Sequence, residues 1–225
     1  PLTWKWMAEI PPDPAWDGPA RWDAYNQIRD LPAMRQYDAA FHPVSDGECV
    51  FWGSSSQDNL TAVDLKTGDQ RWTFVAGGPI RLAPTIDRDR VLFGCDDGNA
   101  YCVHRKTGDL IWKFNPSLKK LADQRRLINN DRLISYFPIR TGVTVRDGLA
   151  YFGASFLPWR ESFICAVDVK TGKLTDETNT FVVQQENATL EGSLLVTNDR
   201  IIVPQGRVAP LLFDRNTGKS LGSLP

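Results

Sequence analysis

Histidine is almost absent from this chain, and its few cysteines have no metal-binding spacing. The 225 residues include two histidines, at positions 42 and 104, and four cysteines, Cys49, Cys95, Cys102 and Cys165. No Cys-x-x-Cys pair occurs and no histidine stands at ligand spacing, so we expect neither a zinc site nor a histidine-based catalytic triad. We interpret the cysteines as small apolar strand residues and His104 as a turn residue. A disulfide between Cys95 and Cys102 is not expected, because a hairpin turn centred on residues 97 and 98 places them diagonally.

Long hydrophobic runs and an excess of charge of one sign are also missing. The formal net charge is −1, with 42% hydrophobic and 24% charged residues. No apolar run approaches the ~20 residues of a membrane-spanning helix, so we expect no membrane span. A strongly basic face is the usual requirement for bulk nucleic-acid binding, and this balanced composition argues against that function.

Several catalytic signatures do not occur. The sequence has no paired carboxylates, no Gly-rich phosphate loop and no nucleophile elbow. The runs Asp96-Asp97 and Asn129-Asn130-Asp131 offer oxygen ligands, but calcium needs about six to eight converging oxygens, and these runs are more simply turns. No signal peptide opens the chain and Pro1 is not a native start, so we expect a mature or excised segment of a longer protein.

What the sequence does contain is a repeat. The segments TAVDLKTG, YCVHRKTG, CAVDVKTG and LLFDRNTG end at Gly68, Gly108, Gly172 and Gly218. Each follows a run of alternating apolar, β-branched and aromatic residues, which is typical of β-strands. The unit is about 40 residues plus insertions, the period of a propeller blade.

The Asp-x-x-Thr-Gly segment predicts a tight turn between two strands. Its Asp accepts hydrogen bonds from the following backbone N–H groups, and its Gly adopts the positive φ that the reversal needs. Trp72 and Trp112 stand four residues after the first two glycines and are predicted to pack against the neighbouring blade. Asp176 and Gly222 occupy the corresponding sequence positions in the other two copies, so weaker docking is expected there.

We therefore predict an all-β protein, a β-propeller of four-stranded antiparallel blades. The blades are expected at residues 38–75, 80–115, 137–183 and 190–225, with an insertion at 116–136 and an orphan strand and wrap at 1–37. Within residues 1–37, the run Trp4-Lys5-Trp6 matches Trp112-Lys113-Phe114 and resembles the last strand of a further blade. Four blades could close as a small ring, but the orphan strand favours an arc of a seven- or eight-bladed propeller whose remainder is absent from this chain.

These repeats resemble those of the pyrroloquinoline-quinone-like (quinoprotein) β-propeller superfamily, whose blades carry A-x-D-x-x-T-G-x-x-x-W. The resemblance covers about residues 38–225; two copies keep the Trp, and the second has Cys102 for the Ala and His104 for the Asp. It implies a periplasmic or extracytoplasmic location. Members include alcohol and glucose dehydrogenases, a lipoprotein of outer-membrane-protein assembly, and bacterial repeat proteins of unassigned role. The runs LINNDRLIS, YFGASFLPWR and VPQGRVAPLLFDR look most like the last group, particularly its planctomycete-type members.

Blade topology predicts where the long connections gather. In a four-stranded meander, the connections between the second and third strands and between successive blades lie at one end. Residues 7–36, 116–136 and 155–161 should therefore share a face, which is the candidate functional surface. It includes Trp159, which either packs down or offers a stacking platform for sugar or peptide. It also includes Arg132 in an insertion of local charge +3, where Ser117 can cap a short helix; a solvated helix face explains that charge equally well.

One pair of residues carries a sharper hypothesis. Pro79-Ile80-Arg81 and Pro138-Ile139-Arg140 occupy equivalent positions at the start of innermost strands, so the two guanidiniums should lie side by side near the channel mouth. Arg207 belongs to a connection at the same end. Arginine suits carboxylate or phosphate, so an anionic ligand could be held there. The alternative is pairing with Glu191, Asp38 or a backbone carbonyl.

Together these observations favour a noncatalytic scaffold that binds a protein, peptide, glycan or small anionic ligand through the loop-rich face, with no cofactor. The alternative is a part of a quinone-dependent alcohol or sugar dehydrogenase, for which the resemblance implies pyrroloquinoline quinone and calcium. Many alcohol-oxidising relatives hold the quinone beside an adjacent Cys-Cys pair. No such pair occurs in this sequence.

Overall fold

The computed structural model describes residues 42–119, 126–129, 132–157, 159–175, 179–205 and 208–224. They form four antiparallel four-stranded sheets, each a simple meander in chain order, here called blades 1 to 4. Blade 1 comprises β1 (Val44–Ser45), β2 (Cys49–Ser54), β3 (Asn59–Asp64) and β4 (Gln70–Val75). Blade 2 comprises β5 (Thr85–Asp87), β6 (Arg90–Gly94), β7 (Ala100–His104) and β8 (Leu110–Phe114).

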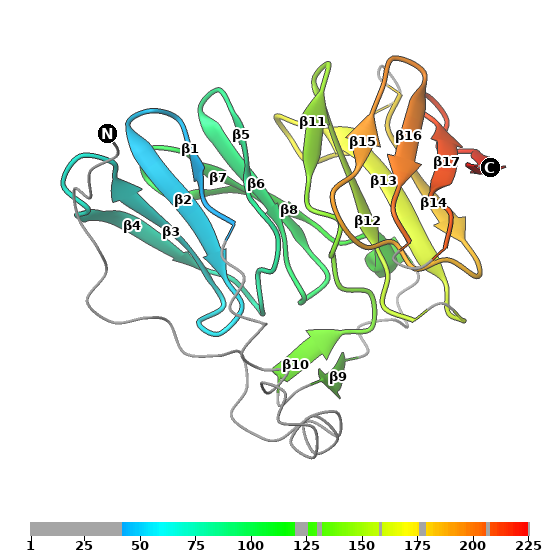
Figure 1. Ribbon diagram of the computed structural model, residues 1–225, viewed down its shortest axis with the longest axis horizontal. Coiled ribbons are helices and arrows are strands. Elements are labelled where there is room, and N and C mark those ends of the chain that lie inside the picture. Colours follow the sequence, from blue (N-terminus) through cyan, green and yellow to red (C-terminus); the bar gives the residue numbers. More distant parts are fainter. Residues whose placement is uncertain are drawn as a thin grey trace.

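Blade 3 comprises β11 (Thr144–Arg146), β12 (Leu149–Ala154), β13 (Ser162–Asp168) and β14 (Phe181–Gln185). Blade 4 comprises β15 (Leu195–Val196), β16 (Arg200–Val203), β17 (Leu211–Asp214) and β18 (Ser220–Ser223). The blades stand side by side in an arc, with blades 1 and 4 at its two ends (Figure 1). The predicted all-β propeller architecture is confirmed. The predicted orphan strand at residues 4–6 and the wrap at 7–36 lie outside the described residues.

The Thr-Gly turns form as the sequence predicts. Asp64 Oδ1 accepts hydrogen bonds from the backbone N of Lys66 at 2.8 Å and of Thr67 at 3.0 Å. Gly68 has φ 80° and donates its N–H to the Asp64 carbonyl. His104 takes the place of this Asp in blade 2, where its Nδ1 accepts from the N of Lys106 at 3.3 Å. His104 is therefore a turn residue, as predicted.

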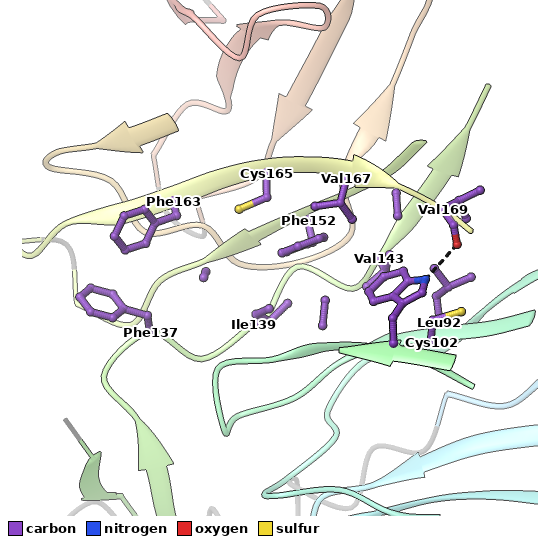
Figure 2. Packing of buried hydrophobic residues seen from close by; sticks show 14 residues of the cluster. Leu92, Cys102, Phe137, Ile139, Val143, Phe152, Phe163, Cys165, Val167 and Val169 are labelled. Atoms are coloured by element: carbon purple, nitrogen blue, oxygen red, sulfur yellow. Dashed lines mark hydrogen bonds between the residues drawn. The ribbon is translucent and has the colours of Figure 1, made fainter. Parts of the chain in front are cut away.

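Apolar side chains fill the spaces between the blades. Between blades 2 and 3, the Trp112 indole packs beneath the next blade's turn and donates its Nε1–H to the Val169 carbonyl at 3.0 Å (Figure 2). A Cβ placed on Gly172, at φ 66°, would lie 2.5 Å from this indole, so only glycine allows the approach. Trp72 donates to the Arg105 carbonyl in the same way between blades 1 and 2. The predicted docking role of both tryptophans is confirmed.

Between blades 3 and 4 an aromatic residue also fills the docking position, although its sequence position, Asp176, predicts none. Phe181 pairs with Ala166 as Trp72 pairs with Ala62, and its ring lies under Gly218 as the Trp112 ring lies under Gly172. The connection between Gly172 and Phe181 is longer than in the first two blades, so counting four residues from the glycine missed the aromatic. In blade 4 the corresponding position is Gly222, paired with Leu212.

The insertion at 116–136 differs from the expected short helix. Its described parts are a 3-10 turn, η2 (Pro116–Lys119), and a hairpin of β9 (Arg126–Asn129) and β10 (Arg132–Ser135). Asn115 caps the turn, because its Oδ1 accepts from the N and the Oγ of Ser117. The predicted cap, Ser117, is therefore the donor.

The four cysteines are free thiols, and Cys95, Cys102 and Cys165 are buried. Burial raises the pKa of Cys102 to about 12 and the pKa of Cys95 well above its ordinary value. These thiols behave as small apolar side chains, as the sequence predicts. Within the described ranges, no helix has the length and apolarity needed to cross a membrane.

Candidate functional site at the loop-rich end

The two Pro-Ile-Arg segments are connectors that cross the end of the preceding blade. Ile80 donates its N–H to the Ser54 carbonyl at 3.2 Å, and Ile139 donates to the Cys95 carbonyl at 3.0 Å. Each isoleucine rests on a glycine of β2 or β6, where a Cβ would not fit. The segments therefore precede β5 and β11. Our prediction that they open the innermost strands is wrong. Their backbones are engaged with the blade behind them, so the strands begin later, at Thr85 and Thr144.

The structure brings Arg81 and Arg140 together at a single carboxylate. Arg81 Nε donates to Asp96 Oδ2 at 2.8 Å, while Arg140 donates from Nε to Oδ1 at 2.9 Å and from Nη2 to Oδ2 at 2.8 Å. Asp96, in the β6–β7 connection, is 1% exposed. Glu191 adds a looser contact, with its Oε1 3.8 Å from Arg140 Nη1. The predicted juxtaposition is confirmed, and Glu191 is one of the partners foreseen; Asp38 lies outside the described residues.

Sequence reasoning missed Asp96 as the main partner of these arginines. The sequence presents Asp96 and Asp97 as two turn residues, and nothing in the local sequence distinguishes one from the other. The distinction lies in their contacts. Asp97 accepts hydrogen bonds from the Asn99 side chain at 2.9 Å and from the Tyr101 hydroxyl at 2.5 Å. Burial, followed by this hydrogen bond, raises the pKa of Tyr101, so its hydroxyl stays protonated and continues to donate.

An exposed aromatic lies at the same end of the blades. Trp159, in the β12–β13 connection, is 70% exposed. It borders a pocket of about 270 Å³ whose other walls are Arg160, Glu161, Glu186 and Asn187. The connection is tied to its surroundings on both sides, because the Arg140 guanidinium lies over the Phe156 ring and the Arg160 guanidinium over the Tyr136 ring. The site thus combines an apolar stacking face with polar groups of both signs.

The remaining candidate arginines fall in different places. Arg132, in β10, forms an ion pair with Asp58 in the β2–β3 turn. This ion pair joins the β9–β10 hairpin to blade 1 at the loop-rich end, where Figure 1 draws the hairpin below the blades. Arg207 lies outside the described residues. The described parts of 116–136 and 155–161 share one end of the arc, as blade topology predicted.

Asp96 and Asp97 do not fit a calcium site. Among the residues that the structure describes, no group of three or more His, Cys, Asp or Glu side chains is placed to hold a metal ion. Both oxygens of Asp96 accept from arginines, and both oxygens of Asp97 accept from Asn99, with the Tyr101 hydroxyl also on Oδ2. Neither carboxylate therefore offers free oxygens to the roughly six to eight ligands that calcium requires.

Comparison with known proteins places the chain in a family. The profile of the family described as "Outer membrane protein assembly factor BamB", built on pyrroloquinoline-quinone-like repeats, matches residues 13–223. The chain belongs to this family. The PQQ-like repeats seen in the sequence and the propeller blades seen in the structure agree with that membership.

Curated relatives and solved structures of this PQQ-like group include several dehydrogenases. The chain is 34% identical to the quinoprotein ethanol dehydrogenase of Pseudomonas aeruginosa, over 36% of this chain and 13% of that protein. It is 28% identical to the dehydrogenase subunit of the quinone alcohol dehydrogenase of Gluconacetobacter polyoxogenes, over 58% of this chain and 18% of that one. The chain therefore spans less than a fifth of these relatives.

Structural similarity confirms the fold. A europium-containing methanol dehydrogenase superposes with a TM-score of 0.60 at 15% identity, covering 82% of this chain and 41% of that one. The quinohemoprotein alcohol dehydrogenase of Comamonas testosteroni gives the same TM-score and identity, covering 79% and 33%. At this identity the likeness shows that the chain has a quinoprotein-type propeller fold.

Proposed function

We propose that this propeller segment is a noncatalytic scaffold that binds a peptide or glycan partner at its loop-rich end, with Trp159 as the main contact. The observation that carries the proposal is the exposure of Trp159 beside the pocket formed by Arg160, Glu161, Glu186 and Asn187. Covering an exposed indole with a bound partner costs little side-chain conformational entropy. Both sugar rings and peptide side chains stack on an indole. Polar groups around the indole would orient such a partner by hydrogen bonds.

In this proposal Arg81 and Arg140 stabilise the connection that carries Trp159. Arg140 links the buried Asp96 to Phe156 in the Trp159 connection, so the rigid blade core positions the exposed indole. A small anion at the arginine pair would compete with the Asp96 carboxylate. The double variant Arg81→Glu/Arg140→Glu tests that anionic ligand: if a folded double variant retains every partner as the parent does, the arginine pair holds no ligand.

The test uses the whole chain in a glycan array and a peptide display library, comparing the parent with Trp159→Ala. Loss of the indole should weaken retention of a true partner by about 2 kcal/mol, or roughly thirtyfold. Leu195→Ala is the matched control, because Leu195 is also an exposed apolar side chain but lies in blade 4, away from this pocket. Equal retention by the parent and Trp159→Ala would overturn the proposal.

A second candidate is a part of a quinone-dependent dehydrogenase, which the identity of the two curated relatives favours. It predicts that the chain, joined to the remainder of a propeller, binds pyrroloquinoline quinone with calcium, gains the absorbance of the quinone, and reduces a dye with an alcohol. The scaffold proposal predicts that none of these occurs.

A further inference from the structure

At two of the three blade junctions, an arginine side chain bonds to the preceding blade at the end opposite the Trp159 pocket. We call this contact the arginine clamp. Arg105, directly after the turn residue His104, forms an ion pair with Asp46 in the β1–β2 turn of blade 1. Arg215, directly after Asp214, donates to Asp147 in the β11–β12 turn of blade 3 at 2.6 Å and to the Tyr151 hydroxyl at 3.0 Å. Each arginine therefore reaches back to the preceding blade and fills the space between two turns.

Val169 occupies this position at the junction of blades 2 and 3. Its N–H donates to the Gly148 carbonyl at 2.9 Å, as those of Arg105 and Arg215 donate to the Asp89 and Asp199 carbonyls. Its carbonyl accepts from the Trp112 indole, just as the Arg105 carbonyl accepts from Trp72 (Figure 2). The backbone N–H contact is equivalent at the three junctions, but the valine side chain has no polar group that could bond to a turn of the preceding blade. This junction consequently lacks the arginine clamp.

A larger pocket opens where the clamp is missing. The pocket at this junction has a volume of about 410 Å³, compared with about 240 Å³ for the pocket beside Arg105 at the junction of blades 1 and 2. Four cations line it, Arg88, Arg90, Arg146 and Lys170, together with the carboxylates of Asp87 and Asp147. A volume of this size suits a small molecule.

The charges of the lining residues do not cancel. Asp147 is held by Arg215 of blade 4 at 2.6 Å, while Arg90 pairs with Asp89 at 2.9 Å and lies 3.9 Å from Asp87. Arg146 donates to the Val196 carbonyl of blade 4 at 2.8 Å and lies 3.7 Å from Asp147. With the partners Asp89 and Arg215 included, five cations stand against three carboxylates, which leaves an excess of two positive charges. Guanidinium groups bind the oxygens of phosphate with planar, paired hydrogen bonds.

From this arrangement we infer a binding site for a compact dianion, a phosphate or small phosphomonoester, between blades 2 and 3. Val145 and Val169 provide an apolar wall for the organic part of a phosphomonoester. The site lies away from the Trp159 pocket and does not depend on the function proposed for that surface. It exists because one residue of the repeat, Val169, is shorter than its two counterparts.

The decisive experiment restores the missing clamp. Inorganic phosphate and glycerol 3-phosphate are titrated into the whole chain by isothermal calorimetry at low ionic strength, with chloride and glycerol as the non-binding comparisons. The parent should bind both phosphates. Val169→Arg should abolish binding, because its guanidinium fills the pocket as those of Arg105 and Arg215 fill theirs. Unchanged binding by a folded Val169→Arg, or no binding by the parent, would overturn the inference.

A second variant decides the question if Val169→Arg does not fold. Lys170→Glu reverses an exposed charge at the pocket and should weaken phosphate binding about tenfold. Lys66→Glu is its matched control, since Lys66 holds the same turn position in blade 1 and lies outside the pocket. Equal weakening by the two variants would show that net charge, rather than this site, attracts the anion, and would refute the inference.

Discussion

Arg140 donates two parallel hydrogen bonds to the buried carboxylate of Asp96, at 2.9 Å and 2.8 Å. Arg81 donates a third to the same group at 2.8 Å. Asp96 belongs to the β6–β7 connection, Arg81 to the connector between blades 1 and 2, and Arg140 to the connector between blades 2 and 3. One carboxylate thus links three separate segments at the loop-rich end, and two guanidiniums share its single negative charge.

Replacement of Asp96 should destabilise the protein strongly. Asp96→Asn leaves two guanidiniums around a neutral amide, and breaking a buried ion pair in this way costs about 3 kcal/mol. Urea unfolding at pH 7 measures the loss. Asp89→Asn is the control, because Asp89 pairs with Arg90 at 2.9 Å but is 59% exposed, and exposed pairs contribute about 0 to 1 kcal/mol. Similar losses in the two variants would contradict a structural role for the Asp96 cluster.

The contact between Gly172 and Trp112 should be intolerant of a methyl group. Gly172→Ala combines a positive φ with a clash, since the new Cβ would meet the indole at 2.5 Å. Gly47→Ala carries the positive φ alone, because nothing lies within 4 Å of a Cβ at that position. The control should lose about 1 to 2 kcal/mol, and Gly172→Ala should lose clearly more. Equal losses of stability, measured by chemical denaturation, would show that the Trp112 side chain can move aside without lowering the free energy of unfolding.

Stability should fall in acid as the turn carboxylates become protonated. The hydrogen bond from Arg71, followed by those from the N–H groups of Thr67 and Lys66, lowers the pKa of Asp64 to about 2. The Thr217 hydroxyl and backbone likewise lower the pKa of Asp214. Because these folded-state pKa values lie below the unfolded value of about 3.9, their stabilisation is complete above that pH and is lost as the pH falls towards 2.

The urea midpoint measured between pH 7 and pH 2.5 reports this loss. Asp64→Asn should flatten the decline between pH 4 and pH 2.5, since the asparagine has no charge to lose. Arg71→Gln should flatten it partly, because the other two hydrogen bonds to Asp64 remain. A profile for Asp64→Asn that superposes on the parent curve would show that this turn does not contribute to the acid dependence.

The thiols should differ in reactivity towards an alkylating reagent. Cys49 is half-buried, whereas the other three are buried, and burial raises the pKa of each of the four. At pH 7.5 the native protein should therefore react slowly and at Cys49 alone, while all four thiols react in urea. Mass spectrometry of the alkylated peptides identifies the sites. Rapid labelling of Cys102 or Cys165 in the native state would mean that the blades separate readily.

The amino-acid sequence alone determined the repeated turns, the blade architecture and the pairing of Arg81 with Arg140 at one end. These features depend on contacts within a few residues, such as Asp64 with Lys66 and Thr67, or on a regular period that repeats from blade to blade. The tertiary structure decided what lies between the blades: Asp96 as the common partner of two arginines, Phe181 as the third docking aromatic, and the pocket beside Val169. Each depends on a connection of irregular length or on one side chain meeting a distant turn, so local pattern carries no signal for it.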